Sequence, residues 1–236
     1  MSTGICIAGR KAMLAKNFLA ATTLLAILKA EPGRAAGGSW STLGPEGARV
    51  ESIVVDTGDT VYAATNGMGF ARLGPDGKFL AGSNEGLMSS IVLSLAVDPH
   101  DANTVYAGTG GSGVFKSADG GKHWTVANKG VEMKTVQSLI ADPHHKGTLY
   151  AGTWGDGVYK SSNGGQEWQP LGEALSSAFI YTLAADSSKP GRLFAGTNNG
   201  AWRSEDEGKT WTRLGPGIPE GGRSEEHTSE LQSHLN

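Results

Sequence analysis

The chain has 236 residues, of which 36 are glycine and 18% are charged, with one cysteine and a formal net charge of −3. Glycine at about twice its usual share of roughly 7% argues against a helical bundle or coiled coil, because glycine weakens helix interiors and supplies turns. The single cysteine excludes an intrachain disulfide, and the mild acidity gives no support to a nucleic-acid partner, which would call for a basic surface.

The first 36 residues have the pattern of a secretory leader. Arg10, Lys11 and Lys16 precede residues 18–28, of which nine of eleven are apolar. A charged segment followed by such a run is typical of an export signal, and the run is shorter than the ~20 residues that span a bilayer. We therefore expect residues 1–36 to be a signal and leader of an exported protein, periplasmic or extracellular, without a membrane span. A misassigned start codon or a short amphipathic helix is the alternative.

The other end has a different origin. Residues 223–233 read Arg-Ser-Glu-Glu-His-Thr-Ser-Glu-Leu-Gln-Ser, which is the in-frame translation of a common sequencing-library adapter. We interpret residues 223–236 as an artefactual, disordered tail outside the fold. Residues 37–222 then remain as the expected domain, with 14 Lys and Arg against 19 Asp and Glu, a net charge of −5.

This domain repeats itself every 44 residues. Tyr-Ala-Gly-Thr at 106–109 recurs at 150–153, as Phe-Ala-Gly-Thr at 194–197 and as Tyr-Ala-Ala-Thr at 62–65. Such a period indicates a solenoid or a propeller. Each unit contains four short β-type runs, which in the second unit are residues 91–97, 104–107, 113–117 and 124–127. The pattern predicts an all-β fold, a β-propeller of four-stranded antiparallel blades. The expected units are residues 46–90, 91–134, 135–178 and 179–220.

The beginning of the domain bears on ring closure. Residues 40–45, Trp-Ser-Thr-Leu-Gly-Pro, repeat the outer-strand sequence Trp-Thr-Arg-Leu-Gly-Pro at 211–216. In closed propellers a lone opening strand of this kind completes the last blade. Four units are at the lower limit of propeller size, so we expect about four blades in a ring that is not complete.

A second motif lies between the third and fourth strand of three units. It has the form Ser-x-Asp/Asn-x-Gly-x-x-Trp, and its residues are Ser117, Asp119, Gly121 and Trp124, then Ser161, Asn163, Gly165 and Trp168, then Ser204, Asp206, Gly208 and Trp211. The Asp or Asn side chain can accept N–H groups of its own turn, and glycine supplies a positive φ. Three recurrences at one spacing favour a structural role over catalysis or calcium binding. We expect no metal and no cofactor, because His144 and His145 repeat a turn of the previous unit and have no third ligand nearby.

Residues 40–215 resemble the Asp-box, or BNR-repeat, β-propellers. That group includes photosystem II stability and assembly factor-like proteins, xyloglucan-hydrolysing enzymes, the sortilin ectodomain and the sialidases, and the compact units are most similar to the first two. The resemblance implies the propeller fold but does not choose a function. The sialidase motif Phe/Tyr-Arg-Ile-Pro is absent from the sequence.

Functional residues are expected in loops that differ between otherwise regular units. The connections from second to third strand and from each blade to the next should emerge on one face. The candidate ligand-binding residues there are Trp154, Asp156, Asn198, Asn199, Met68 and Glu132. Other variable positions in these loops are Asn66, Glu85, Met88, Gly111, Ser112, Lys129, Met133 and Glu173. Trp154 could stack on a sugar ring or on a partner's apolar side chain; the alternative is an aromatic ring packed between loops.

We therefore expect a non-catalytic, exported scaffold that binds a protein partner or a polysaccharide through this face. The alternative is a fragment of a glycoside hydrolase, xyloglucanase-like rather than sialidase-like. That chemistry needs two carboxyl groups ~5 to 9.5 Å apart across a cleft. Asp156, Glu132 and Glu173 lie in same-face loops, so a pair is conceivable.

Overall fold

The computed structural model describes residues 5–7, 27–29, 47–74, 77–81 and 84–215. The predicted leader falls outside these residues except for two short strands, β1 (Ile5–Ile7) and β2 (Ile27–Lys29), which pair in parallel. The predicted opening strand at 40–45 and the predicted tail at 223–236 lie outside the described residues.

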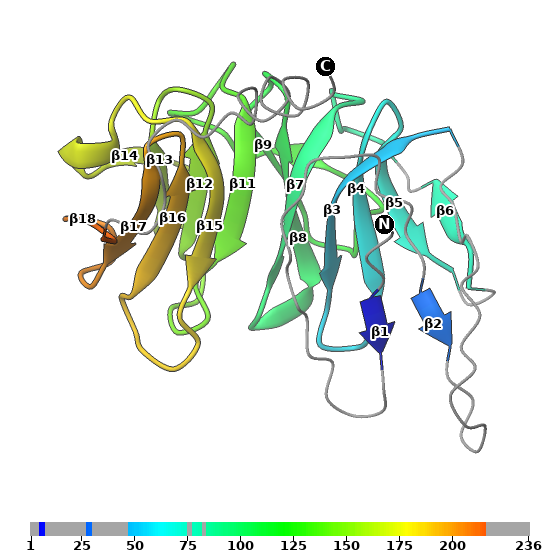
Figure 1. Ribbon diagram of the computed structural model, residues 1–236. Helices are drawn as coiled ribbons and strands as arrows, with labels where there is room; N and C mark the ends of the chain where they lie inside the picture. Colours follow the sequence, from blue (N-terminus) through cyan, green and yellow to red (C-terminus); the bar gives the residue numbers. More distant parts are fainter. Residues whose placement is uncertain (1–4, 8–26, 30–46, 75–76, 82–83, 216–236) are drawn as a thin grey trace, which may run out of the picture.

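Four antiparallel four-stranded sheets follow one another along the chain (Figure 1). Blade 1 contains β3 (Arg49–Val55), β4 (Val61–Asn66), β5 (Gly69–Leu73) and β6 (Phe79–Ala81). Blade 2 contains β7 (Val92–Asp98), β8 (Asp101–Thr109), β9 (Val114–Ser117) and β10 (Thr125–Val126). Blade 3 contains β11 (Val136–Ala141), β12 (Leu149–Thr153), β13 (Val158–Ser161) and β14 (Gln169–Leu171). Blade 4 contains β15 (Ile180–Ala185), β16 (Leu193–Thr197), β17 (Gly200–Ser204) and β18 (Thr212–Arg213).

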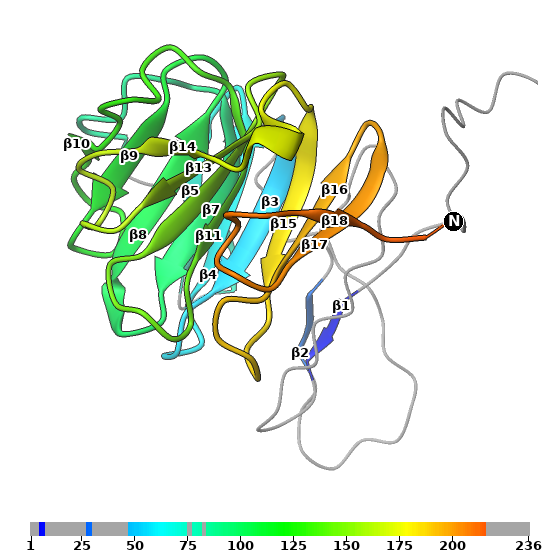
Figure 2. The same ribbon diagram turned by 90° about the vertical axis from the view of Figure 1, so that its left-hand side faces the viewer.

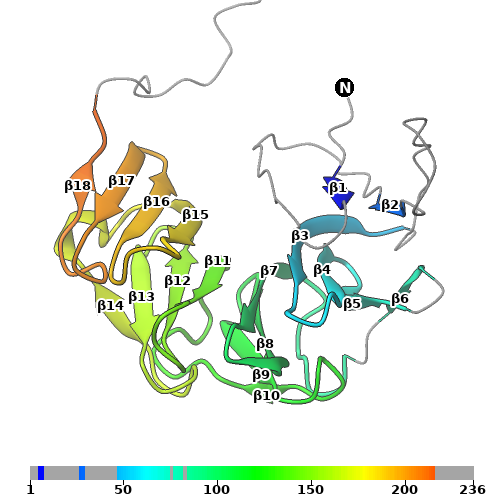
Figure 3. The same ribbon diagram turned by 90° about the horizontal axis from the view of Figure 1, so that it is seen from below.

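The sheets are arranged as the blades of a β-propeller, which confirms the predicted fold class. Seen from below, they follow an arc with β3, β7, β11 and β15 nearest its centre and the fourth strands outermost (Figure 3). The view in Figure 2 shows the sheets set face to face. Within the described residues the helical content is the three-residue 3-10 turn Glu173–Leu175.

The hydrophobic core lies between the blades. All five residues of β12 are buried, and because successive side chains of a strand point to opposite faces, they divide between two neighbours. Leu149 and Ala151 belong to the apolar cluster shared with blade 2, whereas Tyr150 belongs to the cluster shared with Ile180 and Leu183 of blade 4. A strand buried on both faces reads as a continuous apolar run.

Small residues in the second strands let neighbouring blades approach closely. A Cβ atom at Gly152 would lie 2.5 Å from Cγ2 of Ile180, and one at Gly108 would lie 2.7 Å from Cγ1 of Val136, in each case in the next blade. Hydrogen bonds between inner strands accompany this packing, since the Ser94 hydroxyl donates to the carbonyl of Val136 at 3.1 Å. In blades 2 and 3 the glycine of the Ala-Gly-Thr repeat is therefore favoured by the close approach of the next blade.

The tyrosine of the same repeat is tied to an aspartate in the turn between the first two strands. Tyr150 donates its hydroxyl to Oδ2 of Asp142 at 3.3 Å, and Tyr62 does the same to Asp56 at 3.1 Å. Burial alone would raise the pKa of Asp142, but N–H groups of the turn outweigh it and the pKa is lowered. In blade 4, where phenylalanine replaces the tyrosine, Arg192 donates to Oδ2 of Asp186 at 3.2 Å.

Substituting Gly152 with alanine tests the close approach of blades 3 and 4. We expect Gly152→Ala to reduce the free energy of unfolding by about 1–3 kcal/mol, the usual cost of overpacking, measured by urea denaturation. Gly196→Ala is the matched control, because its Cβ would meet only a methyl group of Thr182, at 2.8 Å. Equal losses in the two variants would contradict the inter-blade explanation.

Candidate functional site

The connections that emerge at the upper end of the propeller in Figure 1 form a hydrogen-bonded rim. We call this end the loop end and define the rim as Ile91, Gly110, Thr135, Trp154 and Phe179. The amide of Gly110 donates to the carbonyl of Ile91, and the amide of Trp154 donates to that of Thr135, each at 3.0 Å. Bridges from Gly110 to Thr135 and from Trp154 to Phe179 join one blade to the next. The rim therefore runs without interruption across blades 2, 3 and 4.

Exposed apolar side chains are concentrated at this end. In the described part of the chain six large hydrophobic side chains are exposed: Met88 (70%), Ile91 (38%), Val126 (52%), Met133 (87%), Trp154 (51%) and Tyr181 (41%). Five of them lie on the rim, on the inner strand beside it or in the loops that lead to it. Val126, on the outer strand β10, is the exception.

Three aromatic residues meet where blades 3 and 4 join. The ring centroid of Trp154 lies 5.2 Å from that of Phe179 and 5.7 Å from that of Tyr181, with interplanar angles of 80° and 63°. Tyr181 occupies a bulge between Ile180 and Thr182, and a bulge re-aims the side chain of its unpaired residue. Trp154 is therefore partly covered by aromatic neighbours and still half exposed.

The aromatic partners of Trp154 were not among the residues singled out in the sequence. Each junction between neighbouring blades has three equivalent positions, spaced by the 44-residue repeat. They are Asn66, Ile91 and Leu93 between blades 1 and 2; Gly110, Thr135 and Gln137 between blades 2 and 3; and Trp154, Phe179 and Tyr181 between blades 3 and 4. Of these three junctions, the one between blades 3 and 4 is the only one at which every position is aromatic. Comparing the units at these positions would have found the cluster, but their proximity depends on the strand register.

Two acidic candidates, Asp156 and Glu132, are bonded to groups of the loops at the loop end. Asp156 forms an ion pair with Nζ of Lys134 at 3.1 Å, and that nitrogen also lies 5.3 Å from the centre of the Tyr159 ring. Burial alone would lower the pKa of Lys134, but Asp156 and Tyr159 outweigh it and the pKa is raised. The carboxylate of Glu132 accepts the amide of Gly130 at 2.7 Å.

The remaining candidates have mainly backbone partners. Asn198 accepts the amide of Phe179 through Oδ1 at 3.1 Å, so it supports the backbone of the aromatic cluster. The amide of Asn199 donates to the hydroxyl of Thr197. Met68 is half-buried, and its carbonyl accepts the side-chain amide of Asn84 at 2.9 Å.

Two variable loop positions lie at blade junctions. The carbonyls of Glu85 and Lys129 accept the amides of Trp124 and Trp168, each at 2.8 Å. The side chain of Lys129 also contacts Glu167. These positions connect each loop to the hairpin of the following blade.

The opposite end, which we call the hairpin end, contains the Ser-x-Asp/Asn turns. Ser117 donates its hydroxyl to Oδ1 of Asp119 at 2.7 Å and accepts the amide of Gly121 at 2.9 Å. Asp119 also accepts the amides of Lys122 and His123, each at 3.0 Å. Donation from His123, from its backbone and then its ring, lowers the pKa of Asp119 strongly.

The same geometry holds without a charge in blade 3. Asn163 accepts the hydroxyl of Ser161 at 2.9 Å and the amide of Glu167 at 3.0 Å. The indole of Trp168, which closes this hairpin, donates across the blade junction to the carbonyl of Ala127 at 2.9 Å. The Asp and Asn side chains of these turns thus bond to groups of their own turns, and Trp168 contacts the preceding blade.

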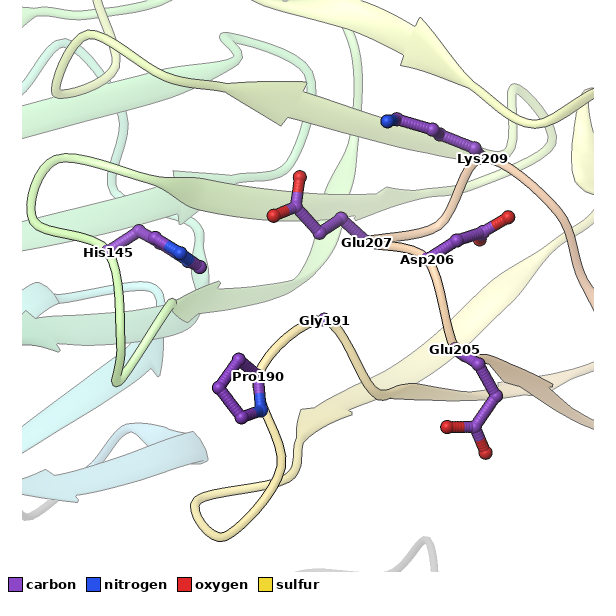
Figure 4. Close-up of a pocket in the computed structure, with 7 residues that line it drawn as sticks. All are labelled: His145, Pro190, Gly191, Glu205, Asp206, Glu207 and Lys209. Carbon is purple, nitrogen blue, oxygen red and sulfur yellow. The ribbon is translucent and has the colours of Figure 1, made fainter.

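A pocket of about 330 Å³ lies at the hairpin end between blades 3 and 4 (Figure 4). Its lining residues are His145, Pro190, Gly191, Glu205, Asp206, Glu207 and Lys209. Glu207 accepts Nζ of Lys160 at 2.7 Å, and Glu205 accepts Lys189 at 2.7 Å and Arg192 at 3.1 Å. Its two glutamates are therefore already paired with bases, and Asp206 accepts the hydroxyls of Ser204 and Thr210. Among the described residues no three His, Cys, Asp or Glu side chains are grouped to hold a metal ion.

The sequence matches no protein-family model and no curated protein. Similar solved structures include an ancestral GH74 enzyme, with a TM-score of 0.64 and 23% sequence identity. The match covers 76% of this chain and 26% of the chain of that enzyme. The GH74 xyloglucanase from Xanthomonas campestris has a TM-score of 0.58 and 19% identity, with 73% of this chain and 31% of that one covered. YCF48 from Cyanidioschyzon merolae has a TM-score of 0.56 and 14% identity, with 72% and 60% covered.

These likenesses show a shared propeller fold. The chain spans about a quarter to a third of the length of the two GH74 structures. Over the residues that the structure describes, no helix has the length and apolar character needed to cross a membrane.

Replacing Asp206 by asparagine tests how the hairpin aspartates respond to acid. Hydrogen bonds from Thr210 and Ser204 lower the pKa of Asp206 to about 2, whereas an unfolded aspartate titrates near ~3.9. Its contribution to stability is therefore complete above pH ~4 and is lost as the pH falls towards 2. Because Asn163 fills the equivalent position in blade 3, we expect Asp206→Asn to retain stability at pH 7 within about 1 kcal/mol.

Below pH ~4 the variant should lose less stability than the wild type with each unit of pH. Urea unfolding at pH 7, 4 and 3 measures this difference. An unchanged acid dependence would show that these hydrogen bonds do not stabilise the aspartate.

Proposed function

We propose that this chain is an exported, non-catalytic β-propeller scaffold that binds a protein partner or a polysaccharide through its loop end. The observation that carries the proposal is the gathering of five of the six exposed large apolar side chains on and beside the rim. A contiguous exposed apolar patch on a folded protein marks an interaction site. Export rests on the charged and apolar pattern of residues 1–36.

We assign residues 37–222 to the propeller domain and residues 223–236 to the adapter-encoded tail. The Ser-x-Asp/Asn hairpins are proposed to be Asp-box repeats with a structural role. Their side chains accept N–H groups of their own turns, and the uncharged Asn163 makes the same contacts as Asp119 and Asp206. A catalytic or calcium-binding group would instead use its oxygens on a ligand.

The ion pair of Asp156 with Lys134 supports a binding role over hydrolysis. A glycosidase needs a general acid whose pKa is raised so that it keeps its proton. At the loop end, Asp156 is held by Lys134.

The second candidate is a part of a glycoside hydrolase. The similarity to GH74 enzymes, one of them a xyloglucanase, favours it. A hydrolysis panel of xyloglucan, other polysaccharides and sialosides on the full chain separates the two functions. We expect no turnover. Turnover that is abolished by Asp156→Asn or Glu132→Gln would overturn the scaffold proposal.

Trp154→Ala tests whether the exposed aromatic residue serves binding. Half of its surface is open, so we expect the free energy of unfolding to change by no more than about 1 kcal/mol, measured by urea denaturation. Binding to immobilised glycans or peptides should fall at least tenfold, as for a tryptophan hot spot. Val126→Ala, which shortens the exposed side chain away from the rim, is the control and should leave binding intact.

A large loss of stability in Trp154→Ala, with no separate loss of binding, would instead make Trp154 a packing residue between the loops.

A further inference from the structure

We infer that the rim binds an extended polypeptide segment whose apolar side chains are flanked by basic residues. This inference rests on the proposed binding function and chooses the class of partner. It is based on the kinds of side chain that line the rim, the state of its backbone groups and the charge of the loops.

The exposed side chains suit a polypeptide better than a sugar. Sugar rings stack on flat aromatic faces, but Phe179 and Tyr181 meet Trp154 at 80° and 63°, so the three rings do not form one flat platform. Met133 and Ile91, two further exposed side chains at the loop end, are a thioether and an aliphatic group. Flexible, polarizable methionine is typical of surfaces that accommodate partner side chains.

Met133 is unusual in its backbone as well as in its exposure. It has a φ of 59°, in the left-handed region, with 87% of its surface open. Two backbone hydrogen bonds close the turn that holds it: the amide of Val131 donates to the carbonyl of Asn128, and the amide of Lys134 donates to the carbonyl of Val131. A bulky residue kept in a strained conformation and presented to solvent is a feature of binding sites. Its loop continues to Thr135, which bonds to Trp154, so it belongs to the same surface.

Two backbone amides at the centre of the rim are already hydrogen-bonded. The amides of Gly110 and Trp154 both donate to neighbouring carbonyls. A partner therefore cannot add a strand by bonding to these two amides and must be recognised at them by its side chains. Trp154, Tyr181 and Met133 provide the apolar contacts for such recognition.

The charge of the loops selects the flanking residues of the partner. Glu132 and Glu173 are exposed on the loops that precede Thr135 and Phe179, and neither is in an ion pair among the described residues. The two lysines of these segments are both paired within the protein, Lys129 with Glu167 and Lys134 with Asp156. The rim is therefore bordered by negative charge, which favours a partner with lysine or arginine beside its apolar side chains.

Selection of a random 12-residue peptide library on the immobilised full chain tests the inference, with a glycan array run in parallel. We expect selected peptides to be enriched in aromatic, leucine or methionine residues together with lysine and arginine. Synthetic copies should lose at least tenfold in affinity on Trp154→Ala and severalfold on Met133→Ser. Val126→Ala is the matched control for an exposed apolar residue and should have no effect. Glu132→Gln with Glu173→Gln should weaken binding at low salt and reduce its salt dependence.

The outcomes separate the two proposals. Glycans bound in a Trp154-dependent manner, without peptide enrichment, would overturn the polypeptide inference and leave the proposed binding function standing. Selected peptides that bind equally well to Trp154→Ala and Met133→Ser would overturn the assignment of this site. Binding in neither arm would contradict both proposals. Circular dichroism and urea unfolding of each variant ensure that a lost interaction is not a lost fold.

Discussion

The close approach of neighbouring blades is the constraint on which this structure depends. The two middle sheets pack against a neighbour on each face, so their interior strands must offer apolar side chains in two directions and still let the next sheet come near. The repeat meets both needs in four residues. In Tyr150-Ala151-Gly152-Thr153 the tyrosine and alanine fill opposite interfaces, and the glycine leaves room for Ile180. Packing of this kind makes each blade dependent on its neighbours for most of its core.

Polar groups at the blade ends are satisfied within short stretches of chain. Asp142 serves the turn between first and second strand, and Asp119 serves the hairpin between third and fourth, in each case by accepting amides of the same turn. Because every buried N–H group needs a partner, these carboxylates shape the turns, and the resulting hydrogen bonds lower their pKa values. The hairpin end is thus rich in carboxylates, but these carboxylates are hydrogen-bonded to the amides of their own turns.

The repeat made the architecture predictable. A 44-residue period with four β-type runs per unit predicted four-stranded blades, and the sheets confirm that reading. The loop site was less accessible. Trp154 was visible as an aromatic residue in a loop of small residues, whereas Phe179 and Tyr181 were not singled out. Whether a residue at the start of a strand is buried depends on a bulge, and a bulge is a matter of register that residue types alone do not reveal.

Variation between units has two different meanings in this chain. At Glu85 and Lys129 the backbone carbonyl contacts the next blade, and the side chains contact His123 and Glu167 of the same hairpins, so variability there is explained by packing between blades. At Trp154, Phe179 and Tyr181 the variation places three aromatic rings in one contact, although the scaffold tolerates glycine, threonine and glutamine at the equivalent positions of the preceding junction. The fold therefore does not require these rings. Exposed aromatic side chains that packing does not need, gathered at one junction of a regular array, are most simply explained by a partner that contacts them.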